Sequence, residues 1–558
     1  MALTWKFSGS SASGKPLPDF RVLAFTGRDD LCLGYVYDTL IVAAALPADK
    51  ARTLQTDLMA AQRLTLTGKR GSGETFARHG IAEEVSWQFN TAGVSLFRIL
   101  LRPRSFRLHL SSHSRLFLNM ALPGLLDKLL REEKLTAASD FENAMGSDYA
   151  MRPLTCQYNE SSFNFLARHL ERVGGYSYIR QTDSGDALVL ADDTSRVEPL
   201  PFRDTLDWSE QETDEVVFSF ARAQTAGPTK VILRDYSPEL PGTLIDADVF
   251  EARHARGGGE MICYGLHNIF GEMASDGFTS KDARDQAGKM ASARLRALVS
   301  AANRAKGEST IPWLQAGYSI TLNGDSFQIL SVRHACNLTE STADEKLLLR
   351  AAGLGFEAAG LGKGYRNTFV CHPLELGSFA PECRTARPVV AGLTHAVVDA
   401  GGSGKYAELD KYGRYKVKFF FPEKVIAADA EVSQDGNWSV PLRMMQSHAG
   451  SGSGIHFPLL KGVEVLVAFT DGDPDRPVIL GALPNPEHPS VVADANHQVN
   501  MIQTPGGHSI SLTDTEAKKE ISLKTPGGHG LSMRDESGKR EILLQSPCGG
   551  SYIRIREQ

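Results

Sequence analysis

The stretch Thr504-Pro-Gly-Gly-His508 returns as Thr525-Pro-Gly-Gly-His529 and, in weakened form, as Ser546-Pro-Cys-Gly-Gly550. The first two copies lie 21 residues apart and agree at 11 of those 21 positions. Inside each copy, apolar residues alternate with polar ones, which is the periodicity of β-strands. Pro-Gly-Gly supplies the chemistry of tight turns between such strands. The repeat therefore predicts short strands joined by turns, in the manner of a β-solenoid.

Two and a half repeats are too few to bury an apolar core within one chain, because about three stacked repeats are normally needed. We therefore expect several copies of the chain to wind together as an intertwined β-prism. The apolar positions of the alternation are its expected core: Ile510, Leu512, Ile521, Leu523, Leu531, Met533, Ile542 and Leu544.

The third copy departs from the pattern by one position. Two shifts of 21 residues from Ile510 lead to Tyr552, whereas the apolar residues here are Ile553 and Ile555. A one-residue slip exchanges the two faces of a strand. We expect either a bulge before this strand or a tip, beginning at Tyr552, that packs differently.

The composition is that of a soluble globular protein with several domains. The chain has 558 residues, of which 42% are hydrophobic and 23% charged, and this length suggests about three or four domains. The net charge of −6 gives no basic signature, so nucleic acid is excluded as an expected partner.

Cysteines and apolar runs bear on the compartment. The seven cysteines are scattered and odd in number, so we interpret them as reduced, small buried thiols. The N-terminal sequence has no apolar stretch suited to a signal peptide, and the best apolar run, Leu40 to Leu46, is too short to span a bilayer. We expect a protein that assembles in the cytoplasm and does not leave by the general secretory route.

The chain changes character after a proline-rich linker. Before it, strand-like and helix-like segments alternate: Leu108, Leu110, Leu116 and Leu118 alternate as in strands, and Ser161-Ser162 predicts a helix N-cap. After it, five predicted strands over about 95 residues fit a small barrel of the OB type. The predicted organisation is an α+β region at 1–372, a linker at 373–388, the OB barrel at 389–485, a bridge at 486–503 and the repeats at 504–558.

Several stretches resemble the VgrG family, the spike proteins of type VI secretion systems, which fuse the hub and spike of contractile phage tails. In the predicted barrel they are Tyr412-Gly-Arg-Tyr-Lys-Val-Lys-Phe419, His456 to Phe469, and Asp471 to Gly481. In the first half they are Phe25-Thr-Gly-Arg28, Tyr158 to Arg168, Leu188 to Asp193, and Tyr365-Arg-Asn367.

The resemblance implies a mainly β fold with an α+β N-terminal half. It comprises a phage hub-like domain with two β-barrels, an OB-fold barrel and a C-terminal triple-stranded β-helix. It also implies a homotrimer on an Hcp-like tube hexamer, held by baseplate proteins. The spike would carry secreted effectors through the type VI apparatus into the target cell or the medium, puncturing the target membrane mechanically.

The resemblance further implies that a PAAR-repeat protein caps the tip. A last strand with free backbone groups would suit docking by β-augmentation. The expected docking residues are Ser551, Tyr552, Ile553, Arg554, Ile555 and Arg556.

Two departures from related spikes bear on enzymatic activity. A phage spike carries a lysozyme domain between barrel and prism, and Asn485–Gln503 leaves no room for one. The sequence stops at Gln558, directly after the third repeat. We therefore expect a structural spike that is not an enzyme.

Two groups of residues raise the question of a metal. Asp471-Gly-Asp-Pro-Asp475 clusters carboxylates as calcium loops do, but it lacks the EF-hand pattern and is interpreted as an acidic turn. In a trimer, three copies of His508 or His529 are donors that suit zinc or iron. Because these histidines are 21 residues apart and follow Gly-Gly, we interpret them as turn residues. No metal or other cofactor is predicted.

A hydrolase is the remaining chemical interpretation. His79 and His113, with Glu83 and Glu84, invite it, but neither a Gly-x-Ser-x-Gly nor a His-Glu-x-x-His motif is present. No catalytic residue is predicted.

The leading hypothesis is therefore the trimeric spike of a type VI system. One alternative is the spike of a phage tail or of an extracellular contractile injection particle. Another is an effector enzyme such as a cell-wall hydrolase, and a weaker one is carbohydrate or nucleic-acid binding by the OB barrel. The identity of the effectors, the cap and the prey is not encoded in a recognisable pattern.

Overall fold

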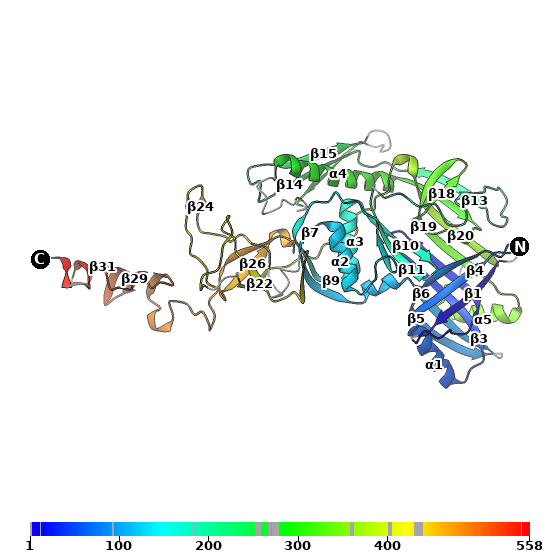
Figure 1. Ribbon diagram of the computed structural model, residues 1–558, viewed down its shortest axis with the longest axis horizontal. Helices are drawn as coiled ribbons and strands as arrows, with labels where there is room; N and C mark the ends of the chain where they lie inside the picture. The colour runs from blue at the N-terminus through cyan, green and yellow to red at the C-terminus, as the bar shows by residue number, and fades with distance from the viewer. Residues whose placement is uncertain are drawn as a thin grey trace. The chain divides into compact units, whose positions relative to one another are not determined.

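The computed structural model describes residues 3–11, 13–91, 94–183, 185–193, 195–251, 258–265, 269, 278–357, 362–399, 404–428, 439–538, 540–547 and 550–557. The chain divides into two compact units. Unit 1 comprises Met1–Val389, Pro422–Gln434 and Asp473–Asp475, and unit 2 comprises Val390–Phe421, Asp435–Gly472 and Arg476–Gln558. Figure 1 labels their elements.

Unit 1 is built on a 12-stranded sheet, six strands of which close into a barrel. The order β1-β4-β5-β6-β3-β2 becomes a ring because β1 also pairs with β2, with Lys6 opposite Arg21. Aromatic side chains fill its interior, where the ring of Trp5 lies 4.6 Å from that of Phe25 and 5.1 Å from that of Phe76. The strands are β1 (Thr4–Ser10), β2 (Phe20–Asp30), β3 (Gly34–Ala44), β4 (Arg63–Lys69), β5 (Thr75–Thr91) and β6 (Val94–Arg102).

A second ring follows from the pairing of β19 with β2. Its strands run in the order β18-β19-β20-β17-β13. β12 pairs with β18, and an isolated bridge from Trp208 to Val217 of β13 completes the circuit. The strands are β12 (Thr205–Leu206), β13 (Val217–Gln224), β17 (Asn303–Ser309), β18 (Ser319–Leu322), β19 (Asp325–Asn337) and β20 (Gly364–Pro373). Unit 1 thus contains two rings of paired strands that share the β2–β19 pairing.

Helices and small sheets surround these rings. α4, a long helix with a capping box at Thr279, lies against β14 and β15 (Figure 1) and buries Ala287, Ala291 and Leu295. Ser161 caps α3, accepting a hydrogen bond of 3.1 Å from the Asn164 amide, which confirms the predicted N-cap. The helices are α1 (Ala48–Met59), α2 (Leu122–Glu132), α3 (Ser162–Val173), α4 (Ser280–Ala302) and α5 (Thr342–Gly353), with short 3-10 helices η1 (Arg104–His109) and η2 (Leu374–Leu376). The small sheets are β10 (Tyr176–Thr182), β11 (Gly185–Ala191) and β8 (Phe141–Asn143); β15 (Ile245–Phe250), β14 (Lys230–Asp235) and β16 (Glu260–Tyr264); and β23 (Lys424–Ala427), β7 (Ser112–Met120) and β9 (Arg152–Ser161).

Unit 2 begins with a small barrel-type sheet in the order β22-β21-β26-β27. Its strands are β21 (Leu393–Val398), β22 (Val417–Phe419), β26 (Glu464–Phe469) and β27 (Pro477–Ala482), with the hairpin β24 (Ala449–Gly450) and β25 (Ser453–Gly454). Two isolated bridges, Tyr415 to Leu442 and Met444 to Ile479, add to this sheet. Short 3-10 helices lie at η4 (Thr470–Gly472) and η5 (Asp494–Asn496).

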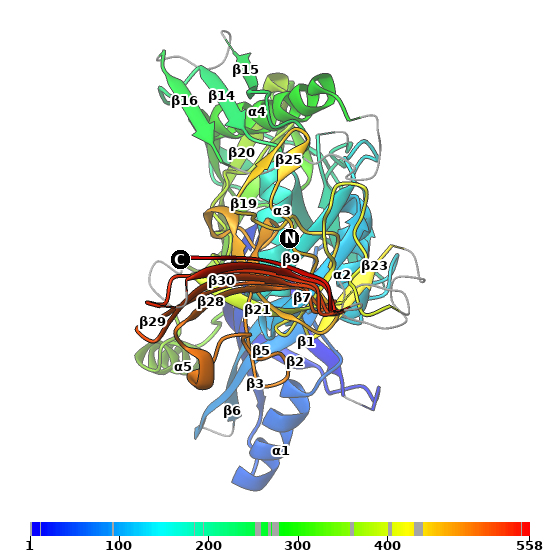
Figure 2. The same ribbon diagram turned by 90° about the vertical axis from the view of Figure 1, so that its left-hand side faces the viewer.

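The repeats form a six-stranded antiparallel sheet, here called the tail sheet, in which each strand pairs with the next along the chain. Figure 2 shows these strands stacked as a ladder. They are β28 (Val499–Gln503), β29 (Ser509–Thr515), β30 (Lys518–Lys524), β31 (Gly530–Arg534), β32 (Glu541–Gln545) and β33 (Tyr552–Arg556). All five pairings are made within one chain, so one copy builds one complete sheet.

Two sequence expectations differ from the structure. β28 lies inside the segment predicted to be a bridge, because this strand precedes the first 21-residue copy and escapes the periodicity. Leu108 belongs to the 3-10 helix η1, not to a strand. Pro103 begins that turn, accepting a hydrogen bond from the Phe106 amide. Among the described residues, no helix is both long enough and apolar enough to cross a membrane.

Candidate assembly surface of the tail sheet

One side of the tail sheet is lined by apolar residues from every strand. The antiparallel register places Leu512 opposite Ile521, and Ile521 opposite Met533. Directly opposed residues share a face of the sheet. This apolar face comprises Ile502, Ile510, Leu512, Ile521, Leu523, Leu531, Met533, Ile542, Leu544, Ile553 and Ile555. The eight residues predicted from the repeat to be core positions therefore do lie together on one surface.

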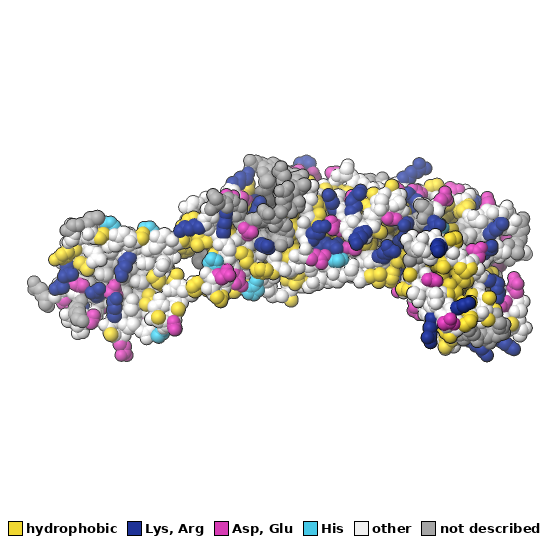
Figure 3. Space-filling model, turned by 60° about the horizontal axis from the view of Figure 1, so that its bottom comes forward, with side chains coloured by type: hydrophobic (Ala, Val, Ile, Leu, Met, Phe, Trp, Pro, Cys, Tyr) yellow, Lys and Arg dark blue, Asp and Glu magenta, His cyan; other side chains and the backbone are white. Residues whose placement is uncertain are grey.

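The apolar face is exposed, whereas the opposite, polar face holds the best buried side chains of the sheet. On β30, Ile521 and Leu523 each expose 43% of their surface, while Glu520 and Ser522 expose 7% and 3%. Figure 3 shows apolar side chains at the surface of the tail among acidic and basic ones. A strand in a soluble protein normally buries its apolar face and exposes its polar face, since burying a leucine side chain contributes roughly 1.5–3 kcal/mol. A single copy of the tail therefore lacks the cover that its apolar face needs.

A ladder of ion pairs crosses the polar face. The guanidinium of Arg534 lies 2.9 Å from the Glu520 carboxylate and 3.3 Å from that of Glu541. Glu541 is also 3.4 Å from Arg554 and 3.3 Å from Arg556 on the last strand. Burial raises the pKa of Glu520, but its hydrogen bonds with Lys518 and Arg534 outweigh burial and lower it below its ordinary value. These ion pairs of the polar face are thus formed within one chain.

The third repeat does not exchange faces, so of the two expectations drawn from its one-residue slip the differently packed tip is wrong, and the additional residue precedes the strand. Ile553 lies opposite Leu544, and Ile555 opposite Ile542, so both continue the apolar face. Leu531 follows Thr525 by six positions, whereas Ile553 follows Ser546 by seven. The additional residue falls in the turn before β33 and restores the alternation, so Tyr552 does not begin a differently packed tip.

The six residues expected to dock a cap lie on or next to β33. Among the described strands, it pairs with β32 alone and forms one edge of the tail sheet. All six are exposed, with Tyr552 and Ile553 each exposing 63% of their surface. An exposed edge strand offers free backbone groups to an added strand.

The histidines of the repeats lie at the turn end of the strands. His508 and His529 are exposed, and the amide of each donates a hydrogen bond of 3.1 Å to the hydroxyl of the threonine that opens its turn. Within the described parts of one chain, no cluster of three or more His, Cys, Asp or Glu side chains is arranged to hold a metal ion.

The acidic turn is more deeply buried than its sequence indicates. Asp473 and Asp475 expose 1% and 7% of their surface and belong to unit 1. Asp475 accepts a hydrogen bond of 2.6 Å from the Cys156 amide, and Asp473 lies 2.5 Å from the guanidinium of Arg387. These carboxylates are therefore engaged by protein donors.

Arg168 forms the centre of the same buried cluster. Its guanidinium lies 2.8 Å from the Glu160 carboxylate and donates a hydrogen bond of 2.9 Å to the Cys156 carbonyl. Burial raises the pKa of Glu160 despite the opposing effect of Arg168. Sequence reasoning missed this cluster, because its members lie up to 319 positions apart.

The histidines that suggested a hydrolase lie on different sheets. His79 is on β5, where its Nδ1 is 2.9 Å from the Thr65 hydroxyl and burial lowers its pKa to about 4. His113 is on β7, with Nδ1 2.6 Å from the Glu423 carboxylate. The structure does not bring these two histidines into one site.

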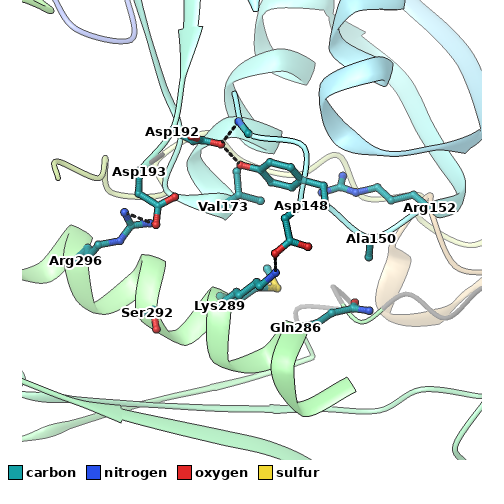
Figure 4. A pocket seen from close by; sticks show the side chains of 13 residues that line it. Asp148, Ala150, Arg152, Val173, Asp192, Asp193, Gln286, Lys289, Ser292 and Arg296 are labelled. Atoms are coloured by element: carbon teal, nitrogen blue, oxygen red, sulfur yellow. Dashed lines mark hydrogen bonds and ion pairs between the residues drawn. The ribbon is translucent and has the colours of Figure 1, made fainter. Parts of the chain in front are cut away.

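A cavity of about 430 Å³ lies in unit 1 between α4 and the segment after β8 (Figure 4). Asp192 accepts hydrogen bonds from the Tyr149 hydroxyl, at 2.7 Å, and from the Gly146 amide. Asp193 pairs with Arg296 at 3.0 Å, and Asp148 pairs with Lys289. Burial and the hydrogen bond to Asp192 raise the pKa of Tyr149, so its hydroxyl remains a donor. The carboxylates drawn in Figure 4 are all neutralised or hydrogen-bonded within the chain.

Two family models match the chain. The phage tail baseplate hub (GPD) family covers residues 39–339, which is more than half of the sequence. The type VI secretion system/phage-baseplate injector OB domain covers residues 424–483.

Relatives and solved structures agree with these matches. The spike protein VgrG5 of the Pseudomonas aeruginosa type VI secretion system is 27% identical over 483 residues, which is 84% of this chain and 56% of the relative. The chain thus spans little more than half the length of that relative. A type VI secretion protein of E. coli, c3393, described as similar to the T4 phage tail proteins gp27 and gp5, superposes with a TM-score of 0.52 at 20% identity, over 83% of this chain and 97% of that one.

The fold likeness extends further in a second structure. The Francisella PdpA–VgrG complex, in its lidded form, gives a TM-score of 0.60 at 12% identity, over 97% of this chain and 80% of the matched one. At such low sequence identities, the structural likeness shows a shared fold alone. With the two closed rings and the OB-domain match, they complete the assignment: the chain belongs to the phage tail baseplate hub family.

Proposed function

We propose that this chain is the spike protein of a type VI secretion apparatus and that it acts as a homotrimer. The observation that carries the proposal is the exposed apolar face of the tail sheet. Three copies related by a threefold axis would turn three such faces inward and leave the ion-pair ladders in solvent. The hub and OB matches and the VgrG relative support the same assembly.

The role follows from this construction. A prism of three sheets with a common apolar core is stiff and unfolds slowly, since closed, interlocked β-structure leaves few free edges. Contraction of a sheath would supply the energy, and the spike would pierce the target envelope with effectors attached or enclosed. No catalytic step is assigned to this chain.

The remaining partners complete the proposal. Two barrels per chain give six in a trimer, which suits a hexameric tube of Hcp-like subunits. The exposed edge of β33 suits a PAAR-repeat cap added by backbone pairing. The protein would assemble in the cytoplasm with baseplate proteins and leave through the type VI apparatus. A phage tail or extracellular injection particle is the alternative within the same architecture.

Export of the tube subunit tests this function. In the bacterium that encodes the chain, with any other spike gene removed, deletion of this gene should abolish release of the tube subunit into the medium. The full chain should restore release, and a chain lacking residues 499–558 should not. Release that continues after deletion would overturn the proposal.

A further inference from the structure

The apolar face of the tail sheet is bordered by histidines at one end of strands β29 and β31 and by acidic residues at the other end. These two borders, which lie at the strand ends, are here called the histidine edge and the acidic edge. His508 precedes β29 directly, and Asp514 lies near its end, six positions later. The second repeat has the same spacing, with His529 before β31 and Asp535 after it. Six is an even spacing, and positions at even spacing share one face of an extended strand.

Each histidine is too far from the acid of its own strand to pair with it. Six residues of β-strand span about 20 Å. All four side chains are exposed. Asp514 accepts a hydrogen bond of 2.9 Å from the Asn500 amide group. Among the described residues, no ion pair joins any of these four side chains to another residue of the same chain.

Threefold closure brings the two edges together. In a cyclic assembly each contact is heterologous, so the histidine edge of one sheet meets the acidic edge of the next. Symmetry also places the same strand of every copy at the same height along the axis. With strands running across the axis, the start of β29 in one copy faces the end of β29 in its neighbour, and the same holds for β31.

We infer that His508 pairs with Asp514, and His529 with Asp535, between neighbouring copies of the trimer. The inference rests on the proposed trimeric spike and adds to it the contacts that join its corners. Lys519 is the cross-strand neighbour of Asp514, and its carbonyl accepts a hydrogen bond of 3.0 Å from the Asp535 amide. A basic residue thus stands beside each acid on the same edge. In the third repeat, the residues before and after β33 are Ser551 and Glu557, so the histidine–aspartate pair is confined to the first two repeats.

Disulfide trapping tests this geometry in the full chain. The matched variant is His529→Cys with Asp535→Cys, in which two cysteines of one chain are too far apart to bond, since a disulfide needs Cα atoms within about 7 Å. Oxidation should therefore link neighbouring copies and give a covalent trimer on a non-reducing gel. The control variant is His529→Cys with Asp514→Cys, whose positions lie two strands, or about 10 Å, apart in height. The single-cysteine variants show the background from the native cysteines.

The outcomes separate this inference from the proposed function. Native mass is measured first for each variant. A trimer in which only the matched pair cross-links supports the inference. A trimer without cross-links, or with equal cross-linking in the control, overturns the inference and leaves the trimer intact. A monomer overturns both.

A charge exchange tests whether the contact is electrostatic. His529→Asp alone would place two carboxylates together at each corner, and like charges directly opposed are destabilising. We expect the dissociation constant of the trimer to rise about tenfold, which corresponds to about 1.4 kcal/mol. Adding Asp535→His should reverse most of that rise. No recovery in the exchanged variant would show that the residues are near each other without pairing.

Discussion

On β6 of unit 1, Phe97 and Ile99 are fully buried, whereas on β32 of the tail, Ile542 and Leu544 expose 42% and 50% of their surface. Both strands carry apolar residues at alternate positions, 97, 99 and 101 on β6 and 542 and 544 on β32. The difference lies in closure: six strands of unit 1 return to their starting strand through the β1–β2 pairing, while the tail strands run out in one open sheet. A single chain therefore closes its barrel but leaves its tail as one open sheet with an exposed apolar face.

Unit 1 and the tail also differ in where they place charged side chains. Unit 1 buries Asp29 and Arg78 inside its fold, where Arg78 donates hydrogen bonds to the Tyr37 hydroxyl at 3.1 Å and to the Leu314 carbonyl at 3.0 Å. The tail places its ladder of ion pairs, made by Glu520, Arg534, Glu541, Arg554 and Arg556, on the side away from the apolar face. Unit 1 thus buries charge, whereas the tail exposes apolar surface.

The largest expected effect comes from placing charge on the apolar face. In the variant Leu512→Asp with Leu544→Asp, two carboxylates would be buried without partners in the assembled trimer, at a cost of several kcal/mol each. We expect loss of the trimer, measured as native mass, with the circular dichroism of unit 1 retained. The matched control is Ser511→Asp with Gln545→Asp, which adds the same charges one position away on the polar face. If both variants stayed trimeric, the apolar face would not be the assembly surface.

The next effect concerns the buried acid of unit 1. Burial raises the pKa of Asp29 to about 7, against an ordinary value of 3.8. A raised folded-state pKa contributes stability that is complete below about pH 4 and is lost as the pH rises to about 7. Asp29→Asn should remove this dependence, so its free energy of unfolding relative to the native chain should rise by on the order of 4 kcal/mol across that window. Chemical denaturation at several pH values measures the difference, and a constant offset would contradict it.

A smaller loss is expected when the buried pair of Arg168 is broken. Glu160→Gln leaves a buried guanidinium without its main counter-charge, and such changes cost roughly 3 kcal/mol. The midpoint of urea unfolding of unit 1 should fall while the native mass stays unchanged. A fall in native mass with unchanged unfolding would show that Glu160 takes part in assembly, so that assembly would no longer be a property of the tail alone.

The smallest effect is expected on the ladder of the polar face. Arg534→Gln removes the contacts to Glu520 and Glu541, but the side chain is 39% exposed. Exposed ion pairs contribute about 0.2–1 kcal/mol. Thermal unfolding of the tail should shift by only a few degrees, and dissociation of the trimer by this change alone would show that the ladder also takes part in assembly.

The sequence predicts local patterns well and distant contacts poorly. The alternation of Ile510 and Leu512 predicted a strand and its apolar face, and Ser161 predicted the start of α3. By contrast, β28 lies outside the 21-residue period. The helix η1 interrupts an alternation that reads as a strand, because Pro103 opens a turn there.

The candidate assembly surface divides in the same way. The repeat placed eight apolar residues on one face because period-2 spacing alone fixes that face. The return of Ile553 to this face depends on one residue in a turn, which strand periodicity does not encode. The burial of Asp473 and Asp475 depends on Cys156 and Arg387, and the parallel pairing of β23 with β7 joins segments about 300 positions apart. No local sequence pattern in those segments predicts such contacts.

The central claim is that the apolar face of the tail is covered by further copies of this chain. Light scattering on the purified full chain tests it most directly, alongside a chain lacking residues 499–558. The account predicts a mass of three times 60.7 kDa for the full chain and weaker trimer formation, with unit 1 still folded, for the shortened one. A stable, folded monomer of the full chain would contradict it, and a shortened chain that remained fully trimeric would move the assembly surface out of the tail.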